Sequence, residues 1–185
     1  MPDEAPLEKT PAGLEPADDG WFIVNVADGA WYRNDVFGAS CGFESGRNDA
    51  ARFQEYGINI HVVWPGQPNC MYHGEAAQED FLVLAGECLL LIEGEERPLK
   101  TWDFVHCPPN TEHGFVGAGN GPCVIFMTGT RKGWPDRGTV YVRSELALRH
   151  GAGVEKETTS GAEAYAPFPK WQLGRPATWD GLPWA

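Results

Sequence analysis

Two stretches decide how this chain folds: PGQPNCMYHGEAAQEDFLVLAGE at residues 65–87 and WDFVHCPPNTEHGF at residues 102–115. His73 and Glu75 are two residues apart, so on a β-strand their side chains project to the same face. Glu79 follows at an even offset, and His113 comes 34 residues later, after a Pro-Pro-Asn turn. Two imidazoles and up to two carboxylates converging from two hairpins would suit a divalent first-row metal. We therefore predict that His73, Glu75, Glu79 and His113 form a metal site.

The sequence around these stretches predicts a series of short strands. Residues 58–64, INIHVVW, alternate, with Ile58, Ile60 and Val62 on one face and Asn59 and His61 on the other. The other expected strands are WFIVNV at 21–26, FLVLA at 81–85, CLLLIE at 88–93, RPLK at 97–100, WDFVH at 102–106 and CVIFMTG at 123–129. Residues 38–50 are expected to form a loop. Short strands at this spacing, separated by Gly and Pro, indicate an antiparallel sandwich or barrel.

The predicted metal ligands also resemble the two sequence motifs of the cupin superfamily. The first motif is matched by Gly66, His73, Glu75, Glu79 and Gly86, with Glu75 where a second histidine is usual. The second motif is matched by Pro108, Asn110 and His113, with Asn110 in place of a glycine and Gly117 in place of the trailing asparagine. The resemblance covers about residues 58–130. It implies an all-β fold, a single antiparallel jelly-roll barrel, and one bound divalent transition metal (Fe, Mn, Ni, Zn or Co).

The length of 185 residues predicts one domain with extensions at both ends. Residues 1–20 are rich in Pro, Ala, Asp and Glu and are expected to be a disordered acidic arm. The barrel is expected at 21–143. Residues 144–185 form a Trp- and Pro-rich extension, with short helices predicted after Ser144 and over residues 160–166. Its three tryptophans, Trp171, Trp179 and Trp184, are expected to pack across the barrel or onto a second subunit, which favours a homodimer.

Composition limits the classes of partner. The formal charge of −12 argues against nucleic acid and anionic membranes, which require clustered Lys and Arg. No apolar run is long enough to cross a bilayer, and the acidic start MPDEAPLEKT does not resemble a signal peptide. The five cysteines form no C-x-x-C pair, so we expect reduced thiols in a cytoplasmic protein. The expected partner is therefore a small-molecule ligand or substrate.

Two functions fit this pattern. The first is a metal-dependent enzyme, foremost an Fe(II) oxygenase, with isomerase chemistry as the main variant. If Glu75 is not a ligand, it is free to act as a general base or as a hydrogen-bond acceptor behind the ligands. The second is a non-catalytic binding protein whose metal is closed by both histidines and both glutamates. The number of open metal positions distinguishes them, followed by a cationic anchor in the pocket. The motifs contain no arginine, which disfavours a phosphorylated substrate unless Arg52, Arg97 or Arg131 reaches in.

Overall fold

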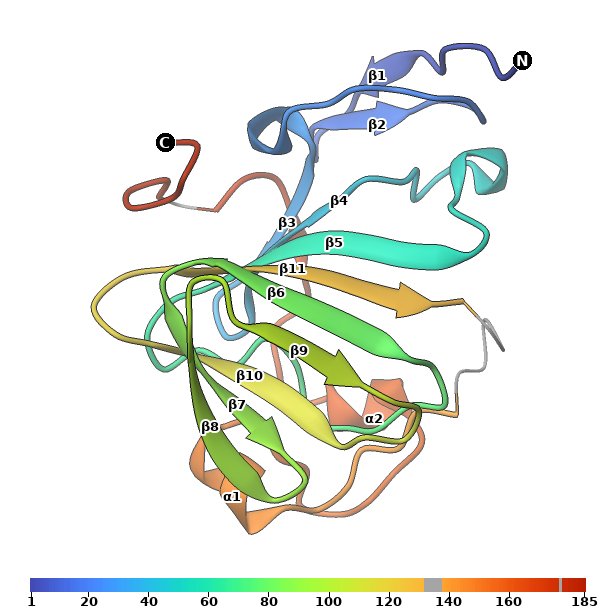
Figure 1. The fold of residues 1–185 in the computed structure, drawn as a ribbon. Coiled ribbons are helices and arrows are strands. Elements are labelled where there is room, and N and C mark those ends of the chain that lie inside the picture. Colours follow the sequence, from blue (N-terminus) through green and yellow to red (C-terminus); the bar gives the residue numbers. More distant parts are fainter. Residues whose placement is uncertain (132–137, 177) are drawn as a thin grey trace.

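The structure, a computed structural model, describes residues 1–131, 138–176 and 178–185. Two antiparallel sheets face one another in a jelly-roll (Figure 1). The larger sheet has the order β12 (Gln172–Leu173), β3 (Ala30–Asn34), β4 (Gly38–Gly42), β5 (Tyr56–Val63), β11 (Cys123–Thr130), β6 (Glu79–Ala85) and β9 (Phe104–Cys107). The smaller sheet has the order β10 (His113–Ala118), β7 (Glu87–Ile92) and β8 (Glu95–Lys100). The expected all-β jelly-roll is confirmed.

The space between the sheets is filled by alternate residues of the strands, as a period of two requires. Phe81 and Val83 of β6 face inward, as do Leu90 of β7, Phe115 of β10 and Ile125 of β11. These side chains are at most 4% exposed. Glu79 and His113 have the same parity as Phe81 and Phe115 on their strands, so both are directed into the barrel interior.

The outer faces of both sheets are also covered, which explains why the strand sequences are apolar on both faces. α1 (Glu145–Arg149) packs on the smaller sheet, where Leu146 contacts the cluster of Leu91 and Val116. Two of the three tail tryptophans, Trp179 and Trp184, pack on the larger sheet against Trp31, with ring centroids 5.4 and 5.7 Å away. This matches packing across the barrel, the first of the two arrangements expected for the tail.

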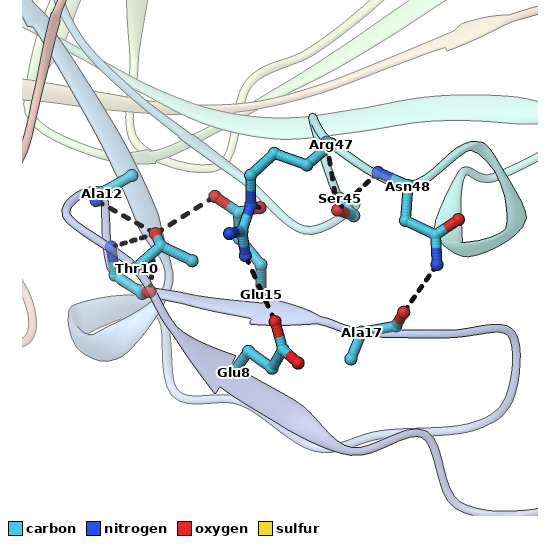
Figure 2. A network of polar contacts seen from close by, with 9 residues as sticks. Glu8, Thr10, Ala12, Glu15, Ala17, Ser45, Arg47 and Asn48 are labelled. Atoms are coloured by element: carbon cyan, nitrogen blue, oxygen red, sulfur yellow. Dashed lines mark hydrogen bonds and ion pairs between the residues drawn. The ribbon is translucent and has the colours of Figure 1, made fainter.

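The N-terminal residues, for which we expected disorder, form a hairpin of β1 (Leu7–Lys9) and β2 (Leu14–Pro16). A polar network fastens this hairpin to the loop after β4 (Figure 2). Glu15, whose side chain is 4% exposed, accepts a hydrogen bond from Thr10 Oγ1 at 3.2 Å and pairs with Arg47 Nε at 3.6 Å. Asn48 Nδ2 donates to the carbonyl of Ala17 at 2.6 Å. Composition gave no sign of the hairpin because polar contacts, with little apolar burial, hold it.

Two other segments differ from expectation. Residues 21–26 form no strand; η1 (Val26–Asp28) begins at their end, capped by the Asn25 side chain, and Ile23 is 83% exposed. Residues 38–42, expected within a loop, form β4. Gly38 has φ +76°, and a Cβ there would lie 2.2 Å from the carbonyl oxygen of Val62, so glycine permits the close approach of β4 to β5. Glycine thus marks tight strand packing here.

The remaining helices are short. η2 (Asp49–Ala51) lies in the loop after β4, and α2 (Gly161–Ala164) follows the Ser160 N-cap, whose side chain accepts from Glu163 N. Ser144 caps α1 in the same way. Both tail helices therefore begin where the sequence predicted. Across the described ranges, every helix is too short or too polar to cross a membrane.

Candidate metal centre

The two predicted histidine ligands face each other across a two-residue β-bridge. The His73 amide donates to the His113 carbonyl at 3.2 Å, and the His113 amide donates to the His73 carbonyl at 2.8 Å. This pairing places the imidazole rings side by side, with centroids 5.2 Å apart. Glu79, the first residue of β6, completes the group from the larger sheet. The site therefore lies where the two sheets meet.

The three side chains hold donor atoms in a geometry that fits one metal ion. One donor atom each from His73, Glu79 and His113 lies within 4.8 Å of the others, and His113 Nε2 is 3.4 Å from Glu79 Oε2. Ligands about 2.1 Å from a common ion at a tetrahedral angle lie about 3.4 Å apart. Gly129 lies opposite Glu79 in the sheet, where a Cβ would come within 3.2 Å of Glu79 Cγ. The glycine therefore leaves room for the carboxylate.

Backbone carbonyls orient both imidazoles. His73 Nδ1 lies 2.8 Å from the Met71 carbonyl oxygen, and His113 Nδ1 lies 3.0 Å from that of Thr111. A carbonyl only accepts, so Nδ1 carries the proton in each ring and Nε2 retains its lone pair. Burial lowers the pKa of His113, opposed by the hydrogen bond to Thr111 and the charge of Glu75. The neutral form that binds metals is therefore favoured.

Glu75, the fourth predicted ligand, lies outside this group of three. Its residue is 6% exposed, its carbonyl accepts from the Asn110 amide at 2.6 Å, and Thr139 Oγ1 lies 3.5 Å from its Oε2. Its charge acts on His113 from nearby. Glu75 does not line the cavity beside the other three residues. The structure thus brings His73, Glu79 and His113 together and leaves Glu75 outside this group.

The three grouped residues line a cavity of about 620 Å³, which is within the usual range for small-molecule sites. Apolar walls come from Ile58, Phe81, Met127 and Trp171. Polar walls come from Tyr32, Ser40, Asn59, His61 and Thr128. Cys70 also lines it, with Sγ 3.8 Å from His73 Nδ1, and burial raises the pKa of this thiol. The site opens into a space that admits a small molecule.

One wall of the cavity carries hydrogen-bond acceptors that the sequence indicated only weakly. His61 and Asn59 share the inward face of β5. His61 Nε2 lies 2.8 Å from the Phe37 carbonyl oxygen, so it carries the proton and Nδ1 is the acceptor. Burial lowers the pKa of His61 to about 4, so its ring is neutral at pH 7. The alternation of residues 58–64 had placed both residues on one face; only the sheet arrangement directs that face into the cavity.

Two arginines line the same cavity, although both lie far from the motifs in sequence. Arg131 follows β11, and Arg52 follows η2. Arg97, the third arginine considered, lies on β8, where it is 61% exposed and pairs with Glu95. The pocket therefore has the cationic groups that the motifs lack. Nothing in the sequence distinguished Arg52 and Arg131 from Arg97. Whether an arginine reaches the cavity depends on how the loop that contains Arg52 packs against the end of β11.

Comparisons with known proteins agree with this architecture. The family model described as "Cupin domain" matches residues 59–129. A sugar phosphate isomerase from Silicibacter pomeroyi is 20% identical with a TM-score of 0.50, covering 59% of this chain and 75% of that one. The polyketide cyclase RemF from Streptomyces resistomycificus is 14% identical with a TM-score of 0.50, covering 60% and 79%.

A third crystal structure, from Acidithiobacillus ferrooxidans, is 26% identical with a TM-score of 0.44. The alignment covers half of this chain and spans 60% of the length of that protein. A search of curated proteins found no match. These similarities extend to the fold, and the chemistry has to be argued from the site itself.

Proposed function

This chain belongs to the cupin superfamily, and on that premise we propose that it is a metal-dependent enzyme acting on a small molecule. The observation that carries the proposal is the group of three donors, His73, Glu79 and His113, beside a cavity. Two imidazoles and one carboxylate leave coordination positions open, as in the 2-His-1-carboxylate sites of Fe(II) oxygenases. An oxygenase reaction is the first candidate, and isomerase chemistry is the variant.

Each side chain of the site would have a separate role. The two histidines present Nε2 lone pairs that the Met71 and Thr111 carbonyls hold in place, so little reorientation is needed on binding. Glu79 contributes one negative charge toward the metal. A divalent metal held there would supply Lewis-acid or redox chemistry to a substrate oxygen. Phe81, which packs against His113 with ring centroids 5.2 Å apart, limits water on that side.

The position of Glu75 supports one of the two roles considered for it. Because its charge acts on His113 and it does not line the cavity, the arrangement favours an electrostatic partner over a base that reaches substrate. The isomerase variant, in which Glu75 moves a proton, would need the carboxylate to reach the cavity. A non-catalytic binding protein, with the metal closed by four protein ligands, would likewise need Glu75 to enter the coordination sphere.

Elemental analysis of protein purified without added metal or chelator tests the proposal. The variants are His73→Ala, Glu79→Ala and Glu75→Gln, each checked for folding by circular dichroism. We expect near-stoichiometric metal in the parent and in Glu75→Gln, and loss in the other two. A parent that binds no Fe, Mn, Ni, Co or Zn even after reconstitution would refute the enzyme mechanism. Loss of metal from Glu75→Gln would instead favour the closed, non-catalytic site.

We further propose that the protein acts in the cytoplasm and forms a homodimer. The five cysteines, at 41, 70, 88, 107 and 123, are all free in the structure, which is compatible with a reducing compartment. Two tail tryptophans already pack against Trp31 of the same chain. Trp102 and Phe104, at the edge strand β9, remain 71% and 64% exposed. Sedimentation velocity tests the dimer: a single monomeric species at micromolar concentration would contradict it.

A further inference from the structure

We propose that the cavity binds an anionic group of its ligand, a carboxylate or a phosphate, through the guanidinium of Arg52. This inference rests on the proposed metal-dependent function, because it concerns the same cavity and names the class of substrate. The charges on the cavity wall, the hydrogen bonds that hold the backbone at Arg52 and the cavity that Arg52 shares with the metal ligands support it.

The charged groups that line the cavity are few. Among the described residues they are Arg52 and Arg131, which are positive, and Glu44 and Glu79, which are negative. Glu79 belongs to the metal donors. A bound divalent ion would therefore leave the described lining with a net charge of about +2. The whole chain carries −12, so the cavity would be a positive region within an acidic protein, and it would concentrate anions.

Both carboxylate oxygens of Glu44 have other partners, so Glu44 does not neutralise the charge of Arg52. Its Oε1 pairs with Arg131, whose side chain is 9% exposed, and its Oε2 accepts a hydrogen bond from the Phe53 amide at 2.9 Å. Arg52 Nε forms an ion pair with Asp49 Oδ1 at 3.2 Å. Asp49 is 91% exposed, so solvent screens this pair and little of the guanidinium charge is cancelled.

The backbone holds Arg52 in place. The Arg52 amide donates to the Asp49 carbonyl at 3.3 Å, which closes η2, and the Ser45 amide donates to the Ala51 carbonyl at 3.3 Å. Ser45 Oγ accepts from the Arg47 and Asn48 amides, and Figure 2 shows how these residues are fastened to the N-terminal hairpin. The loop is therefore preorganised, which reduces the entropy cost of binding a ligand.

The cationic wall approaches the metal ligands along β11, the strand that pairs with the strand carrying Glu79. Gly129 of β11 pairs with Glu79, and Arg131 is two residues further along. Two residues of extended strand span about 7 Å. The hydrogen bond from the Thr130 amide to the Gln78 carbonyl, at 3.0 Å, continues this pairing. A ligand with a metal-binding oxygen at one end and an anionic group at the other would fit such a cavity.

Anion binding tests the inference directly. The 185-residue chain, loaded with Mn(II) and also free of metal, is titrated calorimetrically with inorganic phosphate and separately with malonate. The variants are Arg52→Gln and, as a matched control, Arg97→Gln on the outer strand β8. We expect at least one probe to bind the parent and Arg97→Gln equally, and to bind Arg52→Gln about tenfold or more weakly. The stronger probe identifies phosphate or carboxylate as the preferred anion.

A double variant, Glu44→Gln/Arg131→Gln, removes the neighbouring ion pair without leaving one charge buried. Retained binding in the double variant would assign the anion to Arg52 alone. Equal binding by Arg52→Gln and the parent, or no binding of either probe to the parent, would overturn the inference. Metal content, measured on the same samples, separates this failure from failure of the proposed function, since the metal-free titration tests Arg52 even if no metal is retained.

Discussion

At the scale of single residues, two of the chain's departures from the cupin motifs have steric explanations. Asn110, where the motif has glycine, adopts φ +68°, a left-handed conformation that asparagine tolerates better than other non-glycine residues. Gly117, where the motif has asparagine, lies so close to Trp64 that a Cβ would be 2.1 Å from its carbonyl oxygen. The sequence therefore exchanges residues at two positions according to backbone shape, and neither exchange touches the metal donors.

Asn110 provides a test of this explanation. We expect Asn110→Gly to be as stable as the parent within about 0.5 kcal/mol, and Asn110→Val to lose about 1–2 kcal/mol, because a β-branched residue is strained at positive φ. The backbone amide of Asn110 donates to the Glu75 carbonyl, and relief of the strain would shift this backbone, so the valine variant should also bind metal less tightly. Urea unfolding and metal titration measure the two effects. A valine variant with parental stability would contradict the explanation.

The lowered pKa of His61 implies that the stability of the folded protein depends on pH. Its pKa is lowered to about 4 by burial, so the unfolded chain, with an ordinary value of 6.5, takes up the proton first. The stability from neutral His61 is fully present above about pH 6.5 and is lost as pH falls toward 4. Between pH 7.5 and 5.0 this loss is about 2 kcal/mol. Urea unfolding of the parent should show this excess loss relative to His61→Gln.

The parent and His61→Gln are compared at the same ionic strength, so that all other titrating groups contribute to both curves. If His61→Gln lost the same stability as the parent over this range, His61 would have to titrate normally in the folded protein. That result would contradict the neutral acceptor described for the cavity wall.

Residue by residue, the sequence indicated which side chains form the candidate donor group better than it indicated their surroundings. Spacing of two and four residues placed His73, Glu75 and Glu79 together, and the structure grouped two of them with His113. Parity could not separate Glu75, because its displacement arises where the chain leaves the bridge at His73 and turns toward Asn110. The sequence could not predict which arginine lines the cavity, because the position of Arg52 depends on a loop with no periodic pattern.

At the scale of elements, apolar periodicity predicted the longer apolar strands and missed both the glycine-containing strand β4 and the N-terminal hairpin. The strands β5, β6, β7 and β11 bury both faces, and each was predicted within two residues of its observed ends. The hairpin β1–β2 was missed because its attachment is the buried carboxylate of Glu15 with Arg47 and Thr10 (Figure 2). Acidic composition alone indicated disorder where a specific ion pair stabilises structure.

Breaking this attachment should loosen the hairpin. We expect Arg47→Ala to lower the free energy of unfolding by about 1–3 kcal/mol, because Glu15 would remain buried without its cationic partner. Arg47→Ala/Glu15→Gln should recover part of the loss, since the buried charge is removed. Arg33→Ala, at an exposed arginine on β3, is the control. Limited proteolysis and urea unfolding provide the measurements, and an unchanged Arg47→Ala would refute this account.

At the scale of the whole molecule, the tail completes the larger sheet. Trp179 and Trp184 cover Trp31, which is 0% exposed, and they contact each other with ring centroids 6.1 Å apart. The opposite side of the same sheet forms the cavity wall through Asn59 and His61. One strand, β5, thus presents Ile60 and Val62 to the tail side of the sheet and Asn59 and His61 to the cavity. Covering the outer face therefore stabilises the strand that shapes the cavity.

The tryptophan cluster is expected to contribute to the stability of the whole fold. Trp184→Ala removes a half-buried indole from a packed cluster and should cost about 2–4 kcal/mol, whereas Trp102→Ala, at a side chain 71% exposed, should cost less than about 0.5 kcal/mol. Because β5 joins the cluster to the cavity, Trp184→Ala should also weaken ligand binding, measured with the anion probe. If both variants had the same unfolding midpoint, the tail would be an appendage and the outer face of the sheet would need another cover.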